Sequence, residues 1–355
     1  MHSVSGFSSG GSLAVNHMFA YGTSVTGVGV LGGSPYGCGA LPDASNVCSG
    51  MNDDGKTENR SIPWEQYVER CNAYAHNRAA SDDIDPLTTL AAKRAYLFSG
   101  TLDDVVFTPV MQALAAQLGA FGAVVKRRFD VPAEHAWVVD SETCNRPGVA
   151  VPHACCGNKS KEDKWPPDCP LPPAYEPLAG GCCGLCGAGA PGSGWWWPDL
   201  VYCGGVDLSG EMLRFMLPHR RWLKAPVTAA NLVRLNQSGL LPAGWSAERA
   251  LLDSAGFMYV PQRCRTAAGA CLVHVHYHPC DGSWRKNSAA YMLQSGLAAY
   301  AEGSGMVILH PQAQMDGPLN GCWDWYGATG ADYDTRRGVQ LRVVMTMIER
   351  WREFL

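Results

Sequence analysis

The chain has 355 residues, of which 46% are hydrophobic and 17% charged, and its formal net charge is −4 at pH 7. This composition predicts a globular protein with a sizeable core and argues against disorder. The acidic balance, without a Lys/Arg-rich block, gives no electrostatic basis for binding nucleic acid or an anionic membrane. No stretch approaches the roughly 18 to 20 apolar residues of a membrane span, so we expect a soluble chain.

The first predicted elements surround a glycine-rich serine turn. The segment VSGFSSGGSLAV (4–15) is an apolar run, then Gly6-Phe7-Ser8-Ser9-Gly10, then the first turn of a helix. Gly-x-Ser-x-Gly is typical of a serine nucleophile held on a strained strand-to-helix turn. In the usual hydrolase order, strands and half of the oxyanion hole precede this turn, but here almost nothing does. The following segment GVGVLGG (27–33) predicts a short buried strand.

The next part of the chain predicts a parallel sheet. Residues 36–90 are rich in Pro, Asp and Asn and are expected to be mostly loop. They are followed by RAYLFSG (94–100) as a strand, VMQALAAQLGAFG (110–122) as an amphipathic helix and AVVKRRF (123–129) as a strand. Alternation of strand, helix and strand is the pattern of βαβ units.

The composition changes sharply over residues 145–200. This segment is rich in Cys, Pro and Gly and contains Trp195-Trp196-Trp197, so it predicts a loop insertion within one domain that spans 1–355. Its CxxC spacing (Cys183 and Cys186) suits either zinc or a disulfide knot, and we favour disulfides. The three tryptophans fit core packing of the insertion or an exposed patch that adsorbs to an apolar polymer.

The remaining elements complete an α/β protein without internal repeats. The predictions are a helix at 211–219, two paired strands at 256–261 and 271–280, one helix at 289–305, a buried strand at 306–312 and a closing amphipathic helix at 338–355. His274, His276 and His278 alternate along the second paired strand, which places them on one face. We interpret this as a half-exposed strand face rather than a metal site.

The order of three residues suits nucleophilic catalysis. A serine hydroxyl needs a base to remove its proton, and the base needs a carboxylate to fix its tautomer. In α/β-hydrolases these groups follow in the order Ser, Asp, His, on loops after strands. Here Asp103 and Asp104 follow the strand at 94–100 and His135 follows the strand at 123–129. If the chain is circularly permuted, the strand and loop at 272–282 supply the missing half of the oxyanion hole.

Ordered blocks along the chain resemble the single-domain extracellular polyhydroxybutyrate depolymerases of the fungal type. The similar blocks are SVSGFSSGGSLAV (3–15), GVLGGSPYGC (29–38), YLFSGTLDDVV (96–106), GFMYVPQRC (256–264), HYHPC (276–280), MVILHPQA (306–313), NGCWDWYG (320–327) and GVQL (338–341). They cover nearly the whole chain outside the insertion. The resemblance implies a circularly permuted α/β-hydrolase fold with a Cys-rich insertion.

The resemblance also implies roles for individual residues. Ser8 would be the nucleophile, Asp103 the acid and His135 the general base, and the amides of Ser9 and Cys280 would form the oxyanion hole. Trp323 would line the substrate crevice, and the implied disulfides are Cys38–Cys48, Cys264–Cys271 and Cys280–Cys322. One departure is His278-Pro279-Cys280 where the family usually has His-Gly-Cys, because proline removes an N–H and fixes φ.

The expected function is hydrolysis of poly(3-hydroxybutyrate)-type polyesters or their oligomers by a monomer, without cofactor or metal. The alternatives are a general carboxylesterase for acetyl or feruloyl esters, and a non-catalytic secreted polymer-binding protein. Fifteen cysteines and three sequons, beginning at Asn59, Asn158 and Asn236, favour secretion. Met1-His2-Ser3-Val4 does not begin a signal peptide, so we expect a leader to be missing from this sequence. The odd cysteine count predicts at least one thiol that is free or paired between chains.

Overall fold

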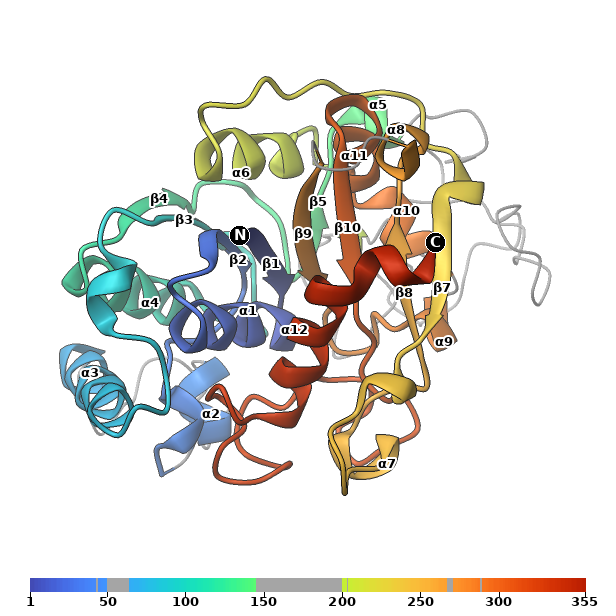
Figure 1. Cartoon of the computed structure of the whole chain (residues 1–355). Coiled ribbons are helices and arrows are strands. Elements are labelled where there is room, and N and C mark those ends of the chain that lie inside the picture. Colours follow the sequence, from blue (N-terminus) through green and yellow to red (C-terminus); the bar gives the residue numbers. More distant parts are fainter. Residues whose placement is uncertain (43, 50–63, 145–199, 203, 267–270, 288) are drawn as a thin grey trace, which may run out of the picture.

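A mixed sheet organises the computed structural model, which describes residues 1–42, 44–49, 64–144, 200–202, 204–266, 271–287 and 289–355 (Figure 1). Within these residues the sheet has eight strands in the order β4-β3-β2-β1-β9-β10-β8-β7. The strands are β1 (His2–Phe7), β2 (Val25–Leu31), β3 (Arg94–Phe98), β4 (Val124–Arg128), β7 (Leu232–Asn236), β8 (Ala255–Tyr259), β9 (Leu272–Tyr277) and β10 (Met306–His310). The short strands β5 (Trp137–Val138) and β6 (Val201–Tyr202) pair separately.

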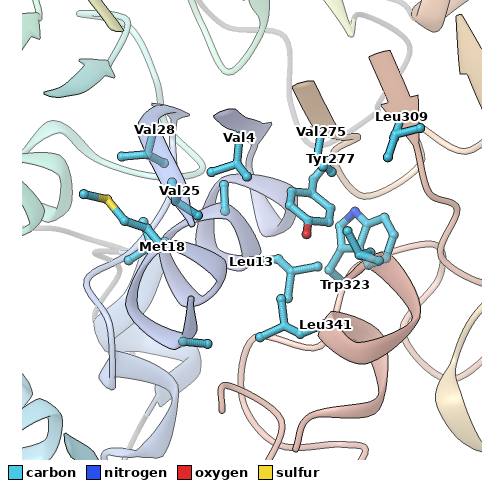
Figure 2. Close-up of a cluster of buried hydrophobic side chains, with 14 of the residues drawn as sticks. Val4, Leu13, Met18, Val25, Val28, Val275, Tyr277, Leu309, Trp323 and Leu341 are labelled. Atoms are coloured by element: carbon cyan, nitrogen blue, oxygen red, sulfur yellow. The ribbon is translucent and has the colours of Figure 1, made fainter. Parts of the chain in front are cut away.

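Helices cover both faces of the sheet. The described helices are α1 (Ser9–Ala20), α2 (Ala44–Ser49), α3 (Trp64–Ala80), α4 (Thr108–Ala120), α5 (Ser141–Cys144), α6 (Leu208–Met216), α7 (Ala247–Ala250), α8 (Gln262–Thr266), α9 (Trp284–Asn287), α10 (Ala290–Gln294), α11 (Leu297–Ser304) and α12 (Val339–Arg350). One core packs α1, α4 and α12 against the sheet, and Figure 2 shows part of it, including Val4, Leu13, Val275 and Leu341. A second core packs α6, α10 and α11 against the opposite face. Because both faces are covered, the inner strands such as β1, β8 and β10 are buried on both sides, whereas the edge strands β4 and β7 are partly exposed.

The N-terminal strand lies in the middle of this sheet. β1 pairs in parallel with β2 on one side and with β9 on the other, so residues from opposite ends of the chain are neighbours. β9 thus supplies the strand beside the serine turn that the N-terminal sequence lacks. This order agrees with the circular permutation that the resemblance implies, and the α/β fold class is confirmed.

Three predicted elements differ from the structure. The strands at 256–261 and 271–280 do not pair, because β10 lies between β8 and β9. The predicted helix at 289–305 is two helices, since Gly296 adopts a positive φ of 85° between α10 and α11. The region 36–90, expected to be loop-rich, contains the 17-residue helix α3. Its buried side is only the narrow stripe Tyr67, Cys71 and Ala75.

The insertion predicted over 145–200 falls almost entirely outside the described residues, which resume at Leu200. The interpretations of its cysteines, of Trp195-Trp196-Trp197, and of the sequons at Asn59 and Asn158 therefore lie outside the described part of the chain. Asn236 is described, and it is an exposed residue at the end of the edge strand β7. Among the described helices, none is both long and apolar enough to cross a bilayer.

Candidate active site

Ser8 lies at a sharp turn between β1 and α1. Its backbone has φ 59° and ψ −126°, a strained conformation for a residue with a side chain, and its N–H donates to the Leu31 carbonyl at 2.8 Å. The two motif glycines explain how this turn fits. A Cβ on Gly6 would lie 2.0 Å from the Gly10 carbonyl oxygen, and a Cβ on Gly10 would lie 2.4 Å from the His278 carbonyl oxygen. The Gly-x-Ser-x-Gly pattern is therefore required by close backbone contacts.

The structure brings Asp103 and His135 together. His135 Nδ1 lies 2.9 Å from Asp103 Oδ2 and 3.1 Å from Oδ1, and both residues are buried. Asp103 Oδ1 also accepts from the amides of Val105 and Val106 at 3.0 and 2.9 Å, which fixes the carboxylate. The neighbouring Asp104 is exposed instead. Of the two aspartates that follow β3, Asp103 is thus the one in contact with the histidine.

Backbone contacts hold the Asp103 and His135 loops against each other. The amides of Thr101 and Leu102 donate to the carbonyls of Val131 and Ala133 at 2.9 and 3.1 Å. Gly100 permits this approach, since a Cβ there would lie 1.9 Å from the Ala133 carbonyl oxygen. Sequence reasoning did not single out Gly100, although a glycine directly after a strand was a usable signal.

His135 lies beside the serine turn. Its ring packs on Phe7, the residue before Ser8, with ring centroids 4.6 Å apart. It also contacts the backbone after β2: a Cβ on Gly32 would be 2.8 Å from His135 Cε1 and 3.4 Å from Asp103 Oδ2. Phe7 and Gly32, which the sequence analysis assigned no role, therefore form the surface on which the imidazole rests.

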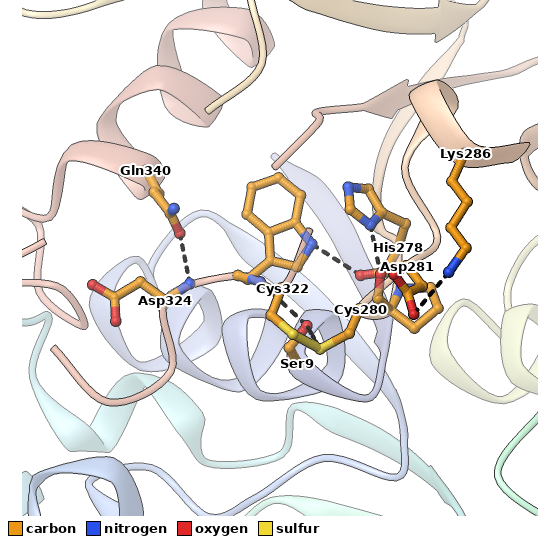
Figure 3. Close-up of a disulfide and its surroundings, with 10 residues drawn as sticks. Ser9, His278, Cys280, Asp281, Lys286, Cys322, Asp324 and Gln340 are labelled. Atoms are coloured by element: carbon orange, nitrogen blue, oxygen red, sulfur yellow. Dashed lines mark hydrogen bonds and ion pairs between the residues drawn. A yellow bond between two sulfur atoms is a disulfide. The ribbon is translucent and has the colours of Figure 1, made fainter. Parts of the chain in front are cut away.

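The loop that carries Cys280 is fastened to the start of α1 (Figure 3). A disulfide joins Cys280 to Cys322, and Ser9 Oγ lies 3.3 Å from Cys280 Sγ. The Trp323 amide donates to the same Ser9 Oγ at 3.2 Å. Ser9 begins α1, so its amide belongs to the first turn, where N–H groups have no partner within the helix. Such amides, together with the positive end of the helix dipole, favour a developing negative charge.

The Pro279 carbonyl is held by two contacts within this loop. The Pro279 carbonyl accepts from the Gly282 amide at 2.9 Å and lies 2.7 Å from His278 Nδ1. His278 Nε2 lies 3.1 Å from the Ala313 amide, which can only donate, so Nε2 is the acceptor and Nδ1 carries the proton. Burial lowers the pKa of His278 to about 4, which keeps the ring neutral. The histidine therefore stabilises the turn in which glycine is usual.

Trp323 was expected to line the substrate crevice, but it lies in the core. Its side chain is fully buried, and its Nε1 donates to the His278 carbonyl at 2.9 Å. The indole thus supports the Cys280 loop from inside the core, because a buried indole N–H requires an acceptor. The exposed aromatic residue of this segment is Tyr326, at 44%.

The alternating histidines of β9 are also placed differently. His274 and His276 lie on β9 and His278 directly follows it, and all three are buried rather than half-exposed. Ser5 Oγ lies 2.8 Å from both His274 Nε2 and His276 Nδ1, which makes a buried polar network between β1 and β9. No group of His, Cys, Asp and Glu among the described residues could hold a metal ion. The face is hidden because helices cover both sides of the sheet.

The three disulfides implied by the resemblance are present: Cys38–Cys48, Cys264–Cys271 and Cys280–Cys322. Cys71 is a free, buried thiol that packs in a small cluster with Cys38, Cys48 and Tyr67. Burial raises the pKa of its thiol to about 12, so the reactive thiolate is suppressed.

Comparisons with known proteins show which proteins this chain resembles. No protein-family model matches the chain. It is 30% identical over 356 residues, 98% of its length, to the poly(3-hydroxybutyrate) depolymerase of Delftia acidovorans, of which it spans 58%. It is 27% identical over 362 residues to the polyhydroxybutyrate depolymerase of Talaromyces funiculosus, covering 98% of this chain and 88% of that relative.

Two solved structures have a similar fold. The PHB depolymerase of Penicillium funiculosum superposes with a TM-score of 0.69 at 23% identity, over 97% of this chain and 94% of that one. A serine-to-alanine variant of PHB depolymerase in complex with an R3HB trimer gives a TM-score of 0.71 at 23% identity, over 98% and 94%. The chain is thus similar in sequence, over nearly its whole length, to two poly(3-hydroxybutyrate) depolymerases, and it shares the fold of the two solved structures.

Proposed function

We propose that this protein is a serine esterase that hydrolyses poly(3-hydroxybutyrate)-type polyesters or their oligomers. The observation that carries the proposal is the buried His135–Asp103 pair packed beside the strained Ser8 turn. The names of the relatives favour this substrate over other esters, since both are depolymerases of poly(3-hydroxybutyrate).

The proposed reaction begins with proton transfer from Ser8 Oγ to His135 Nε2 as Oγ attacks the ester carbonyl carbon. Asp103 holds the Nδ1–H tautomer of His135 and stabilises the imidazolium that forms. The amides of Ser9 and Cys280 donate to the oxyanion of the tetrahedral intermediate.

Collapse of this intermediate breaks the C–O bond of the ester, and His135 returns the proton to the leaving alkoxide. A hydroxyl-ended chain departs and an acyl group stays on Ser8. His135 then removes a proton from water as the water oxygen attacks the acyl carbon. Collapse of this second intermediate breaks the bond between that carbon and Ser8 Oγ, His135 returns the proton to Oγ, and the acid departs. Each step uses groups of this chain and water alone.

We further propose that the chain acts outside the cell, as one monomeric domain over 1–355. Three disulfides support an oxidising compartment, because such bonds are rare in the cytosol.

The test compares wild type with Ser8→Ala on poly(3-hydroxybutyrate) film and on p-nitrophenyl butyrate. The proposal predicts that wild type releases acid from both and that the variant loses both activities. Cleavage of the soluble ester alone would replace the polyester assignment with a general carboxylesterase. A folded wild type that cleaves neither would favour a non-catalytic polymer-binding protein.

A further inference from the structure

A pocket lies at the edge of the sheet opposite Ser8. Ser8 follows the end of β1, whereas this pocket is formed where the parallel strands β2, β3 and β9 begin. Its volume is about 440 Å³, within the range of small-molecule sites. Its lining is mostly apolar, with side chains such as Met216, Leu217 and Leu272, and it also includes the cationic residues Arg94 and Arg220.

Arg94 provides one cation in the lining of this pocket. It is the first residue of β3, and within the described residues no carboxylate lies within ion-pair distance of it. Its guanidinium carbon lies 5.3 Å from the centroid of the Phe215 ring on α6. Stacking of this kind holds a guanidinium in place and leaves its N–H groups available at the rim.

Arg220 provides a second cation that is also held in place. Its Nη2 donates to the carbonyls of Ser304 and Gly305 at the end of α11. Arg263 approaches the same point: a Cβ on Gly305 would lie 3.1 Å from Arg263 Nε and 3.6 Å from Arg220 Nη2. Burial and this like charge lower the pKa of Arg220. In the described part of the chain neither arginine has an acidic partner, so positive charge gathers here on a protein whose net charge is −4.

We propose that this pocket binds a monocarboxylate with a short aliphatic chain. The arginines would pair with the carboxylate, and the apolar walls would take up the carbon chain. Two fixed guanidiniums lower the entropic cost of binding, because little side-chain freedom remains to be lost. The mainly apolar lining favours an organic acid over an inorganic anion. Binding does not rest on the proposed function, although the acids released by that reaction belong to the same class.

The test is calorimetric titration of the Ser8→Ala protein with butyrate and with 3-hydroxybutyrate, with butyramide and sulfate as comparisons. The proposal predicts saturable binding of both acids, and at least tenfold weaker binding of butyramide, which lacks the charge, and of sulfate, which lacks the chain. Arg94→Gln and Arg220→Gln should each weaken butyrate binding at least tenfold. The matched control is Arg127→Gln, which removes the same charge from the exposed side of β4 and should leave the affinity unchanged.

Three results would overturn the proposal. The first is absence of butyrate binding to the Ser8→Ala protein. The second is unchanged butyrate affinity in both pocket variants. The third is binding of butyramide or sulfate as tight as that of butyrate. The melting temperature of each variant is measured without ligand, and if Arg220→Gln is unfolded, Arg94→Gln alone decides. The titration measures heat of binding to the Ser8→Ala protein and requires no ester hydrolysis. A negative result would therefore refute the pocket proposal without refuting the proposed esterase activity.

Discussion

Gly10→Ala is the substitution that most directly disturbs the geometry around Ser8. A Cβ at this position would lie 2.4 Å from the His278 carbonyl oxygen and 2.5 Å from that of Tyr277. Contacts of this kind are essentially absent below 3.0 Å, so backbone must move by roughly 0.6 Å. The Cys280 loop cannot withdraw freely because it is bonded to Cys322 and supported by Trp323.

This shift separates the Cys280 amide from the start of α1, where the Ser9 amide lies. Loss of one oxyanion donor in an acyl-transfer enzyme costs about 10² to 10³ in kcat. We expect a fall in kcat of about 10²-fold, equivalent to about 2.7 kcal/mol of transition-state stabilisation, with a smaller change in KM. The assay is steady-state hydrolysis of p-nitrophenyl butyrate, with circular dichroism to verify the fold.

The matched control is Gly119→Ala on α4. A Cβ there meets nothing within 4 Å, so alanine should leave kcat unchanged and raise stability by about 0.5 to 1 kcal/mol through helix propensity. Wild-type kcat in a folded Gly10→Ala protein would refute the reasoning, because it would mean that the distance between α1 and the Cys280 loop has no effect on the reaction.

Three further predictions concern the acid, the disulfide and pH. Asp103→Asn should lower kcat about 10³- to 10⁴-fold with little change in melting temperature, because a neutral amide cannot stabilise the imidazolium. A decrease in kcat of less than tenfold would exclude Asp103 as the acid of the triad. Cys280→Ala/Cys322→Ala should lower the free energy of unfolding by about 4 kcal/mol for a separation of 42 residues, measured by urea titration, and an unchanged midpoint would contradict this. Burial lowers the pKa of His274 and His310 to about 3, below the unfolded value of 6.5, so the unfolded state binds more protons between these values. These two imidazoles should therefore contribute no slope above pH 6.5 and lower the stability by at most about 3 kcal/mol per pH unit below it, in the same direction as buried His278. Equal urea midpoints at pH 7 and pH 5 would contradict the assignment of neutral buried imidazoles.

The sequence predicted the parts of the site that local patterns encode. The Ser8 turn was predictable because its glycines are required by close contacts within the motif and with the neighbouring strand. The contact between Asp103 and His135 was predictable because both residues follow strands that alternate with helices, and such strands end at the same edge of a parallel sheet. Asp103 could not be separated from Asp104, since the choice depends on which carboxylate is buried against the histidine.

Features that depend on distant parts of the chain were mispredicted. The alternation of His274, His276 and His278 is compatible with a solvent-exposed strand face. These histidines are buried only because helices of the second core cover that side of the sheet. Trp323 was expected at a crevice because of the family resemblance, but its side chain is fully buried beside His278 and the Cys280–Cys322 disulfide. The pairing of β8 with β10 likewise reflects an antiparallel edge that local sequence does not specify.

Covalent labelling with a fluorophosphonate, followed by mass-spectrometric mapping of the modified residue, tests the central claim most directly. Such reagents react with a serine only where a base activates the hydroxyl and an oxyanion site accepts the phosphoryl oxygen. The structure predicts one adduct on the peptide that contains Ser8, no adduct in Ser8→Ala, and slow labelling in His135→Ala. An adduct on another residue, or none on a folded wild type, would contradict the assignment of Ser8 as nucleophile.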